Sequence, residues 1–189
     1  FNFWTKGEGL FGRKTVHIAD DPEGEIITGS DGKDIVFASD GAHLIDTGGG
    51  HDRVYAGDGD STISTGSGND RVYAGDGAFD IDGGSGHDRI SVGFGNATIA
   101  GGSGNDRIFA AGGDNHIDGG SGNDRIRTGY GNDTIFGGSG NDRIRSLGGD
   151  NVIDGGAGHD RIRTGDGDDL IAGGDGHDWI RSGWGNNTI

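Results

Sequence analysis

The chain has 189 residues, a formal net charge of −16 and no cysteine. Its 46 glycines and 29% hydrophobic residues cannot build a globular core of ordinary thickness, and no disulfide framework can replace one. No apolar run approaches the roughly 18 residues that span a bilayer, so we expect no membrane-spanning segment.

Residues 1–28 differ from the rest of the chain because they do not follow its repeat. Aromatic residues are frequent at the start, as in Phe1, Phe3 and Trp4, and residues 14–18 alternate like a strand. We expect residues 1–28 to be a cap over the end of the repeat array or the end of a preceding domain, and residues 29–189 to form the array itself.

From Gly29 the sequence divides into rows of nine residues without insertion or deletion. Position eight is Val or Ile in every row and position four is Gly, which indicates a repeat architecture. Position six differs between odd and even rows, so the structural period is eighteen. In most even rows it is not Asp, and the first four even rows carry His43, Ser61, Phe79 and Ala97 there. Odd rows carry an acid at position six: Asp34, Asp52, Asp70, Asp88, Asp106, Asp124, Asp142, Asp160 and Asp178.

Each row predicts a Gly-rich turn at positions one to six and a short strand at positions seven to nine, with the β-branched residue pointing inward. Two rows make one coil, so the expected fold is an all-β parallel solenoid with eighteen residues per coil. Turns of odd rows lie on one flank, the odd flank, and turns of even rows on the other, the even flank. Without a bound metal, this composition favours disorder.

Most turns of the odd rows have the form Gly-Gly-x-Gly-x-Asp, which indicates a cation site. Glycine exposes backbone carbonyls, Asp adds a carboxylate, and a site of oxygen ligands alone favours Ca²⁺ over Mg²⁺. Nine stacked Asp residues leave eight gaps, so we expect about eight Ca²⁺ ions. The turn glycines of the expected sites are Gly84, Gly86, Gly102, Gly104, Gly120, Gly122, Gly138, Gly140, Gly156, Gly158, Gly174 and Gly176.

Rows such as Gly101–Phe109, Gly119–Arg127 and Gly137–Arg145 resemble the nonapeptide of the RTX, or haemolysin-type, calcium-binding repeats. The resemblance implies a right-handed parallel β-roll that is disordered at low calcium and folds outside the cell after type I secretion. Such repeats occur in exported toxins, metalloproteases, lipases, polysaccharide epimerases, adhesins and surface-layer proteins, and the resemblance does not choose among them.

The even rows depart from this family pattern. His43, Ser61, Phe79 and Ala97 supply no carboxylate, so we expect the first half of the even flank to be free of metal. Asp133 and Asp169 leave room for weaker sites near the end of the chain. The expectation is one calcium-loaded flank and one largely empty flank.

Positions seven and nine of the odd rows point outward and collect eleven of the fifteen basic residues on one face. The arginines either cover the sheet and offset the nearby Asp residues, or bind a partner with repeated negative charge. Candidate partners are an acidic polysaccharide, lipopolysaccharide or a second copy of the chain. The expected contact residues are Arg53, Arg71, Arg89, Arg107, Arg125, Arg127, Arg143, Arg145, Arg161, Arg163 and Arg181.

Several function classes fit the sequence poorly. The acidic balance and the absence of a nucleic-acid motif argue against DNA or RNA as a partner. Polar residues recur with the repeat instead of forming one singular constellation, so we expect no enzyme activity here. The sequence therefore predicts an extracellular, adhesive calcium-binding scaffold; the alternatives are an accessory module that folds and positions an exported toxin or enzyme, and an ice-binding rod.

Overall fold

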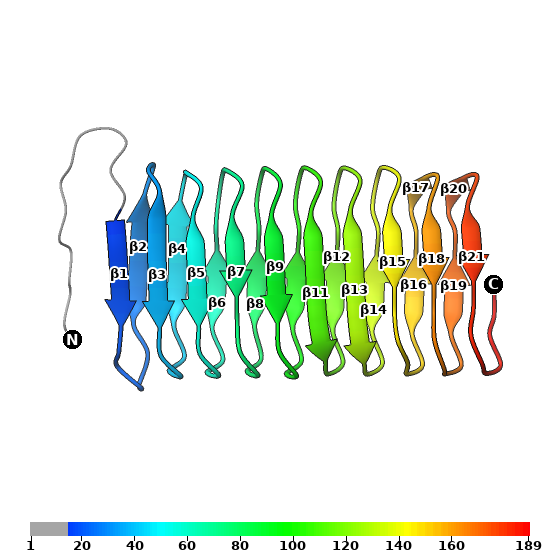
Figure 1. Ribbon diagram of the computed structural model, residues 1–189, viewed down its shortest axis with the longest axis horizontal. Helices are drawn as coiled ribbons and strands as arrows, with labels where there is room; N and C mark the ends of the chain where they lie inside the picture. The colour runs from blue at the N-terminus through cyan, green and yellow to red at the C-terminus, as the bar shows by residue number, and fades with distance from the viewer. Residues whose placement is uncertain (1–14) are drawn as a thin grey trace.

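The computed structural model describes residues 15–189, which form a flattened rod of stacked parallel strands (Figure 1). One sheet, here the odd sheet, has ten strands. They are β1 (Thr15–Ala19), β3 (Asp34–Ala38), β5 (Arg53–Ala56), β7 (Arg71–Tyr73), β9 (Arg89–Val92), β11 (Arg107–Gly112), β13 (Arg125–Tyr130), β15 (Arg143–Arg145), β18 (Arg161–Arg163) and β21 (Trp179–Arg181).

The second sheet, the even sheet, has nine parallel strands and faces the first across a thin core. They are β2 (Ile26–Ser30), β4 (Leu44–Gly48), β6 (Thr62–Ser64), β8 (Asp80–Asp82), β10 (Thr98–Ala100), β12 (His116–Asp118), β14 (Thr134–Phe136), β16 (Val152–Asp154) and β19 (Leu170–Ala172). A short pair, β17 (Ala157–Gly158) and β20 (Asp175–Gly176), lies in the turns of the odd flank.

The strand register confirms the predicted period. In the odd sheet Ile108 pairs with Ile126, and in the even sheet Ile117 pairs with Ile135, so partners are eighteen residues apart. Because the period is constant, residues at one row position form straight columns along the rod. The predicted fold class, an all-β parallel solenoid with eighteen residues per coil, is confirmed.

Residues before Gly29 also enter both sheets. Strand β1 pairs with β3 and β2 pairs with β4, so one coil precedes the first row. Thr15 pairs with Asp34, nineteen residues away, whereas Ile27 pairs with Ile45, eighteen away, which places one extra residue in the turn around Pro22. Residues 1–14 lie outside the described part of the chain, and the role proposed for 1–28 stays a prediction.

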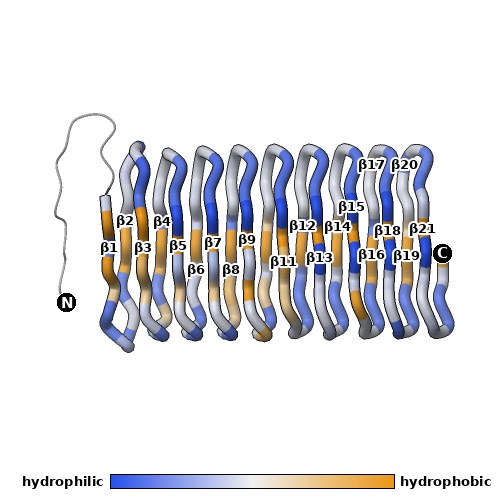
Figure 2. Tube along the Cα trace, viewed as in Figure 1, coloured by the Kyte–Doolittle hydropathy of each residue, from blue (hydrophilic) through white to orange (hydrophobic). Residues whose placement is uncertain are grey.

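The core is the ladder of Val and Ile residues at position eight. These side chains are buried from Val36 to Ile171, and the two sheets contribute them alternately. Burying an aliphatic side chain of this size contributes about 1.5–3 kcal/mol. In Figure 2 the ladder is visible as apolar positions along both sheets, between hydrophilic turns. A core one side chain thick explains how so few hydrophobic residues suffice.

Glycine is required in the turns because adjacent coils stack with little space between them. Gly104 has φ of 125°, and a Cβ there would overlap the carbonyl oxygen of Gly86 one coil earlier. Backbone pairing also continues through the odd turns, where the Ser103 N–H donates to the Gly84 carbonyl at 2.8 Å. The turns therefore form a continuous, hydrogen-bonded flank.

Candidate calcium-binding flank

The Asp residues at position six of the odd rows form one buried column along the odd flank. From Asp34 to Asp160 they are at most 3% exposed. From Asp52 onward, one carboxylate oxygen of each accepts the main-chain N–H of the Asp one coil earlier; for example, Asp88 N donates to Asp106 Oδ1 at 2.7 Å. This bond recurs along the column, so each carboxylate holds the coil before it in place.

The second oxygen of each carboxylate is buried and has no hydrogen-bond partner. This holds for Oδ2 of Asp52, Asp70, Asp88, Asp106, Asp124, Asp142 and Asp160. Within residues 15–189 the one ion pair joins His17 to Asp34, at 3.6 Å, so no side-chain cation neutralises the rest of the column. An unpaired buried charge is strongly destabilising, and such a column requires protons or metal ions.

Burial sets the electrostatic state of these carboxyl groups. Desolvation raises the pKa of Asp52 and Asp142 to about 6. It raises the pKa of Asp88 and Asp124 to about 7, with neighbouring carboxylates of the column adding to the shift. Without a cation, the column therefore binds protons near neutral pH; with one, it stays ionised.

The donor set fits a hard cation. Among residues 15–189 no three His, Asp or Glu side chains come together as a metal cluster. Any site must therefore combine the free Asp oxygens with backbone carbonyls of the Gly-rich turns. Oxygen ligands alone, in flexible numbers, are what Ca²⁺ accepts.

The glycines predicted for these sites all lie in the turns beside the Asp column. Every one of them has a positive φ, from 82° at Gly84 to 145° at Gly158, which brings the turn backbone into a conformation that side chains disfavour. Their role as ligands through backbone carbonyls stays a prediction, as does that of Asp178, which lies in the last coil of the odd flank.

Comparison with known families decides what these turns are. The family model described as the RTX calcium-binding nonapeptide repeat matches residues 23–54, 46–78, 80–99, 91–126, 118–153, 127–162 and 154–189. The chain belongs to this family. RTX repeats bind Ca²⁺ and form β-rolls, so this chain is a calcium-binding β-roll, and its repeat is structural rather than catalytic. Neither a curated protein nor a solved structure matched the chain.

The even flank of this RTX chain has a different set of buried groups. From His43 to Asn115, two polar position-six side chains are bonded across coils: Ser61 Oγ accepts the His43 N–H at 3.0 Å, and Asn115 Oδ1 accepts the Ala97 N–H at 3.0 Å. Phe79 is buried at the same position. These groups offer no free carboxylate, and the largely empty flank stays a prediction.

The last third of the even flank contains unpaired polar atoms. Asn115 and Asn151 donate to Oδ1 of Asp133 and Asp169 at 2.9 and 2.8 Å, but Oδ2 of each acid is buried without a partner. Three buried hydroxyl groups beside them are also unpaired; they belong to Thr128, Ser146 and Thr164. Sequence analysis missed these hydroxyls. Their signal was the change at position one from Ala or Val in earlier even rows to Thr or Ser.

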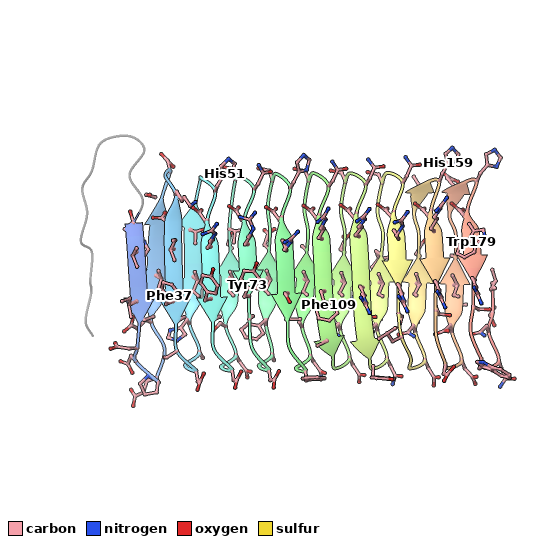
Figure 3. All side chains as sticks on the ribbon, viewed as in Figure 1. Phe37, His51, Tyr73, Phe109, His159 and Trp179 are labelled. Atoms are coloured by element: carbon pink, nitrogen blue, oxygen red, sulfur yellow. The ribbon has the colours of Figure 1, made fainter. Side chains whose placement is uncertain are left out.

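The arginines of the odd rows form two columns on the odd sheet (Figure 3). Arg125 pairs with Arg143 and Arg143 with Arg161, and all but the half-buried Arg53 are exposed. At the other end of the face Phe37, Tyr55 and Tyr73 stack with ring centroids 5.1 and 5.3 Å apart. Arg127 lies over the Phe109 ring, 5.9 Å from its centroid. In residues 15–189 none of these arginines forms an ion pair with an acid.

Proposed function

We propose that this chain is an extracellular scaffold segment that folds when calcium binds to its odd flank. The observation that supports this proposal is the column of buried Asp oxygens without partners. RTX repeat proteins are typically secreted, and calcium is abundant outside cells. In residues 15–189 no helix is long and apolar enough to cross a membrane.

The same column makes folding conditional on the ion. In the unfolded chain each carboxylate is hydrated, whereas in the roll it is buried against its neighbours. Ligands that bind only the folded state stabilise it by mass action, and about eight sites on one rod couple strongly to folding. The chain therefore folds as calcium rises and unfolds when calcium is removed.

A calcium titration followed by circular dichroism, with bound calcium counted by atomic emission, tests this proposal. The expected result is a cooperative gain of β structure with about eight ions per chain. A chain that is fully folded in chelator at neutral pH would contradict the coupling. A count of about sixteen ions would contradict the division into a loaded and a largely empty flank.

We further propose that the arginine face is the contact surface of the scaffold, for an acidic polysaccharide, lipopolysaccharide or a second copy of the chain. Its arginines stack at strand spacing, about 4.8 Å, without acidic partners. Like charges at this spacing repel, so an anionic partner stabilises the folded face. Binding that high salt abolishes supports this role. The alternative, an accessory module, predicts an inert monomer whose removal disables an attached toxin or enzyme.

A further inference from the structure

A shallow groove on the odd side of the rod is lined by arginine on one wall and by Asn and His on the other. One wall is the position-seven arginine column, with Arg125, Arg143 and Arg161. The other wall is the edge of the odd turns at position five, with Asn123, Asn141 and His159. The buried carboxyl groups of Asp124 and Asp142 form its floor, where we have proposed bound calcium.

The position-five residues are oriented by a hydrogen-bond ladder of their own. Asn123 Oδ1 accepts the Asn141 N–H at 2.8 Å, and Asn141 Oδ1 accepts the His159 N–H at 2.8 Å. His159 continues the ladder because its Nδ1 accepts the His177 N–H at 2.9 Å. The acceptor atom of each side chain is thus used along the rod. One amide N–H is used as well, because Asn141 Nδ2 donates to Asn123 Oδ1 at 3.1 Å. What remains is the second amide N–H of Asn and, in the neutral ring, the Nε2–H of His.

The groove therefore presents hydrogen-bond donors on both walls. Guanidinium groups have no acceptor, and the acceptors of the opposite wall are occupied by the ladder. With the Asp carboxylates of the floor neutralised by calcium, walls that carry donors alone disfavour neutral ligands that must also donate, and favour carboxylate, sulfate or phosphate groups. Because the columns run along the rod, the ligand that fills them repeats its negative charge along its length.

The even side of the rod shows that this chemistry is not imposed by the fold. The corresponding groove there is lined by Asn96, Asp114 and Asn132 on one wall and by Thr98, His116 and Thr134 on the other, without arginine. The same ladder exists, and Asp114 Oδ1 accepts the Asn132 N–H at 2.7 Å. Asp is therefore structurally acceptable at position five. The even rows use it in Asp60, Asp114, Asp150 and Asp168, whereas no odd row does.

We propose that the odd-side groove binds a linear anionic polysaccharide with carboxylate or sulfate groups on successive sugars, lying along the rod over β13, β15 and β18. This inference rests on the contact role proposed for the arginine face, and specifies the site and the ligand. Nucleic acid is the weaker polyanion for this groove, since the whole chain carries a net charge of −16 and contains no nucleic-acid-binding motif.

The test measures binding of a fluorescent heparin-derived oligosaccharide to the full chain in saturating calcium. Arg125, Arg143 and Arg161 are replaced together by Gln, and the control replaces Arg127, Arg145 and Arg163, which lie on the same strands outside the groove. Both triple variants change the net charge equally. If the groove is the site, replacing Arg125, Arg143 and Arg161 lowers the affinity for the oligosaccharide about tenfold or more, and the control triple lowers it much less.

A second pair of variants isolates the other wall. Asn141→Asp keeps the Oδ1 that accepts the His159 N–H, but replaces the amide donor, including its bond to Asn123 Oδ1, with a negatively charged oxygen. Because the site is exposed and the main-chain ladder is kept, we expect binding to weaken several-fold with an unchanged dichroism spectrum. Asn132→Asp places the same charge at position five on the even side, and is expected to leave binding unchanged.

The possible outcomes distinguish the groove, the wider arginine face and the kind of ligand. Equal losses in the two arginine triples overturn the groove but leave the charged face as the contact surface. If the unaltered chain does not bind the oligosaccharide, neither the groove nor the wider arginine face binds polysaccharide. Equal affinity for single-stranded DNA of matched charge overturns the polysaccharide as ligand, and self-association blocked by the first triple alone assigns the groove to a second copy.

Discussion

At the scale of single residues, the Asp column carries the chemistry of this roll. Position six was identifiable from the sequence because an acid recurs every eighteen residues. The two roles of each carboxylate were not identifiable. One oxygen of Asp106 binds the coil before it, and the other is buried and unpaired, which depends on how the turns stack. The eighteen-residue period identifies the Asp residues, and the stacking of the turns determines what each carboxylate oxygen contacts.

Asp124→Asn tests the unpaired oxygen. Asn keeps an oxygen for the bond that Asp124 accepts from Asp106, but replaces the free anionic oxygen with an amide. We expect the calcium midpoint of folding to rise several-fold, because one carboxylate of the column is lost. In chelator the variant should fold no worse than the unaltered chain. Asp80→Asn is the matched control, since Asp80 is exposed on the even sheet, and an equal shift there would contradict a role specific to the column.

The raised pKa values predict how pH acts on the chain. Without calcium, the folded-state pKa of Asp88 and Asp124 is about 7, above the ordinary value of 3.8. A carboxyl group whose pKa is raised by folding binds protons more tightly in the folded state, so its protonation favours the roll. That favourable effect is present at acidic pH and is lost as pH rises from about 4 to about 7.

We therefore expect β structure in chelator at pH 4.5 that disappears by pH 7.5, and a calcium midpoint at pH 5.5 higher than that at pH 7.5, because protons compete with the metal. Circular dichroism across this range measures both effects. A calcium-free chain that gains β structure as pH rises would show that the buried carboxylates do not control folding.

At the scale of the elements, strands and turns were predictable to different degrees. Position eight predicts a three-residue strand in every row, and its β-branched residues are buried as expected from Val36 to Ile171. The first coil was harder to predict, because β1 lies before the repeat and the turn at Pro22 contains an extra residue. The buried hydroxyls of Thr128, Ser146 and Thr164 were not predicted. The sequence shows a change to Thr or Ser at position one, but the burial of these groups depends on how the even flank packs.

The turns depend on glycine more than on any other residue type, and Gly104→Ala tests this dependence. The added Cβ would meet the Gly86 carbonyl oxygen, and alanine at a φ of 125° is strained. We expect a loss of about 2 kcal/mol or more in saturating calcium, measured by urea unfolding. The neighbouring Ser103→Ala is the control and should cost less than about 0.5 kcal/mol, because Ser103 is exposed. Equal stability of the two variants would indicate that the coils separate to accept a side chain.

At the scale of the whole molecule, the rod is two nine-residue arrays that alternate along one chain. Odd rows supply the Asp column and the arginine face, and even rows supply the other sheet, so function depends on rows staying in phase with the coil. Deleting residues 119–136 removes one whole coil and keeps that phase. Deleting residues 119–127 removes one row, which moves every later odd row to the even side and divides the Asp column between the flanks.

The two deletions therefore have opposite expected results despite the similar sequence removed. The eighteen-residue deletion should fold with a sharp calcium transition and about one ion fewer, since nearest-neighbour contacts between coils are preserved. The nine-residue deletion should fold at higher calcium with a broader transition, because the coupled column becomes two shorter ones and the arginine columns change sheets at the junction. Calcium titrations of both proteins provide the comparison. Equal sharpness would mean that calcium sites fold coil by coil without coupling along the column.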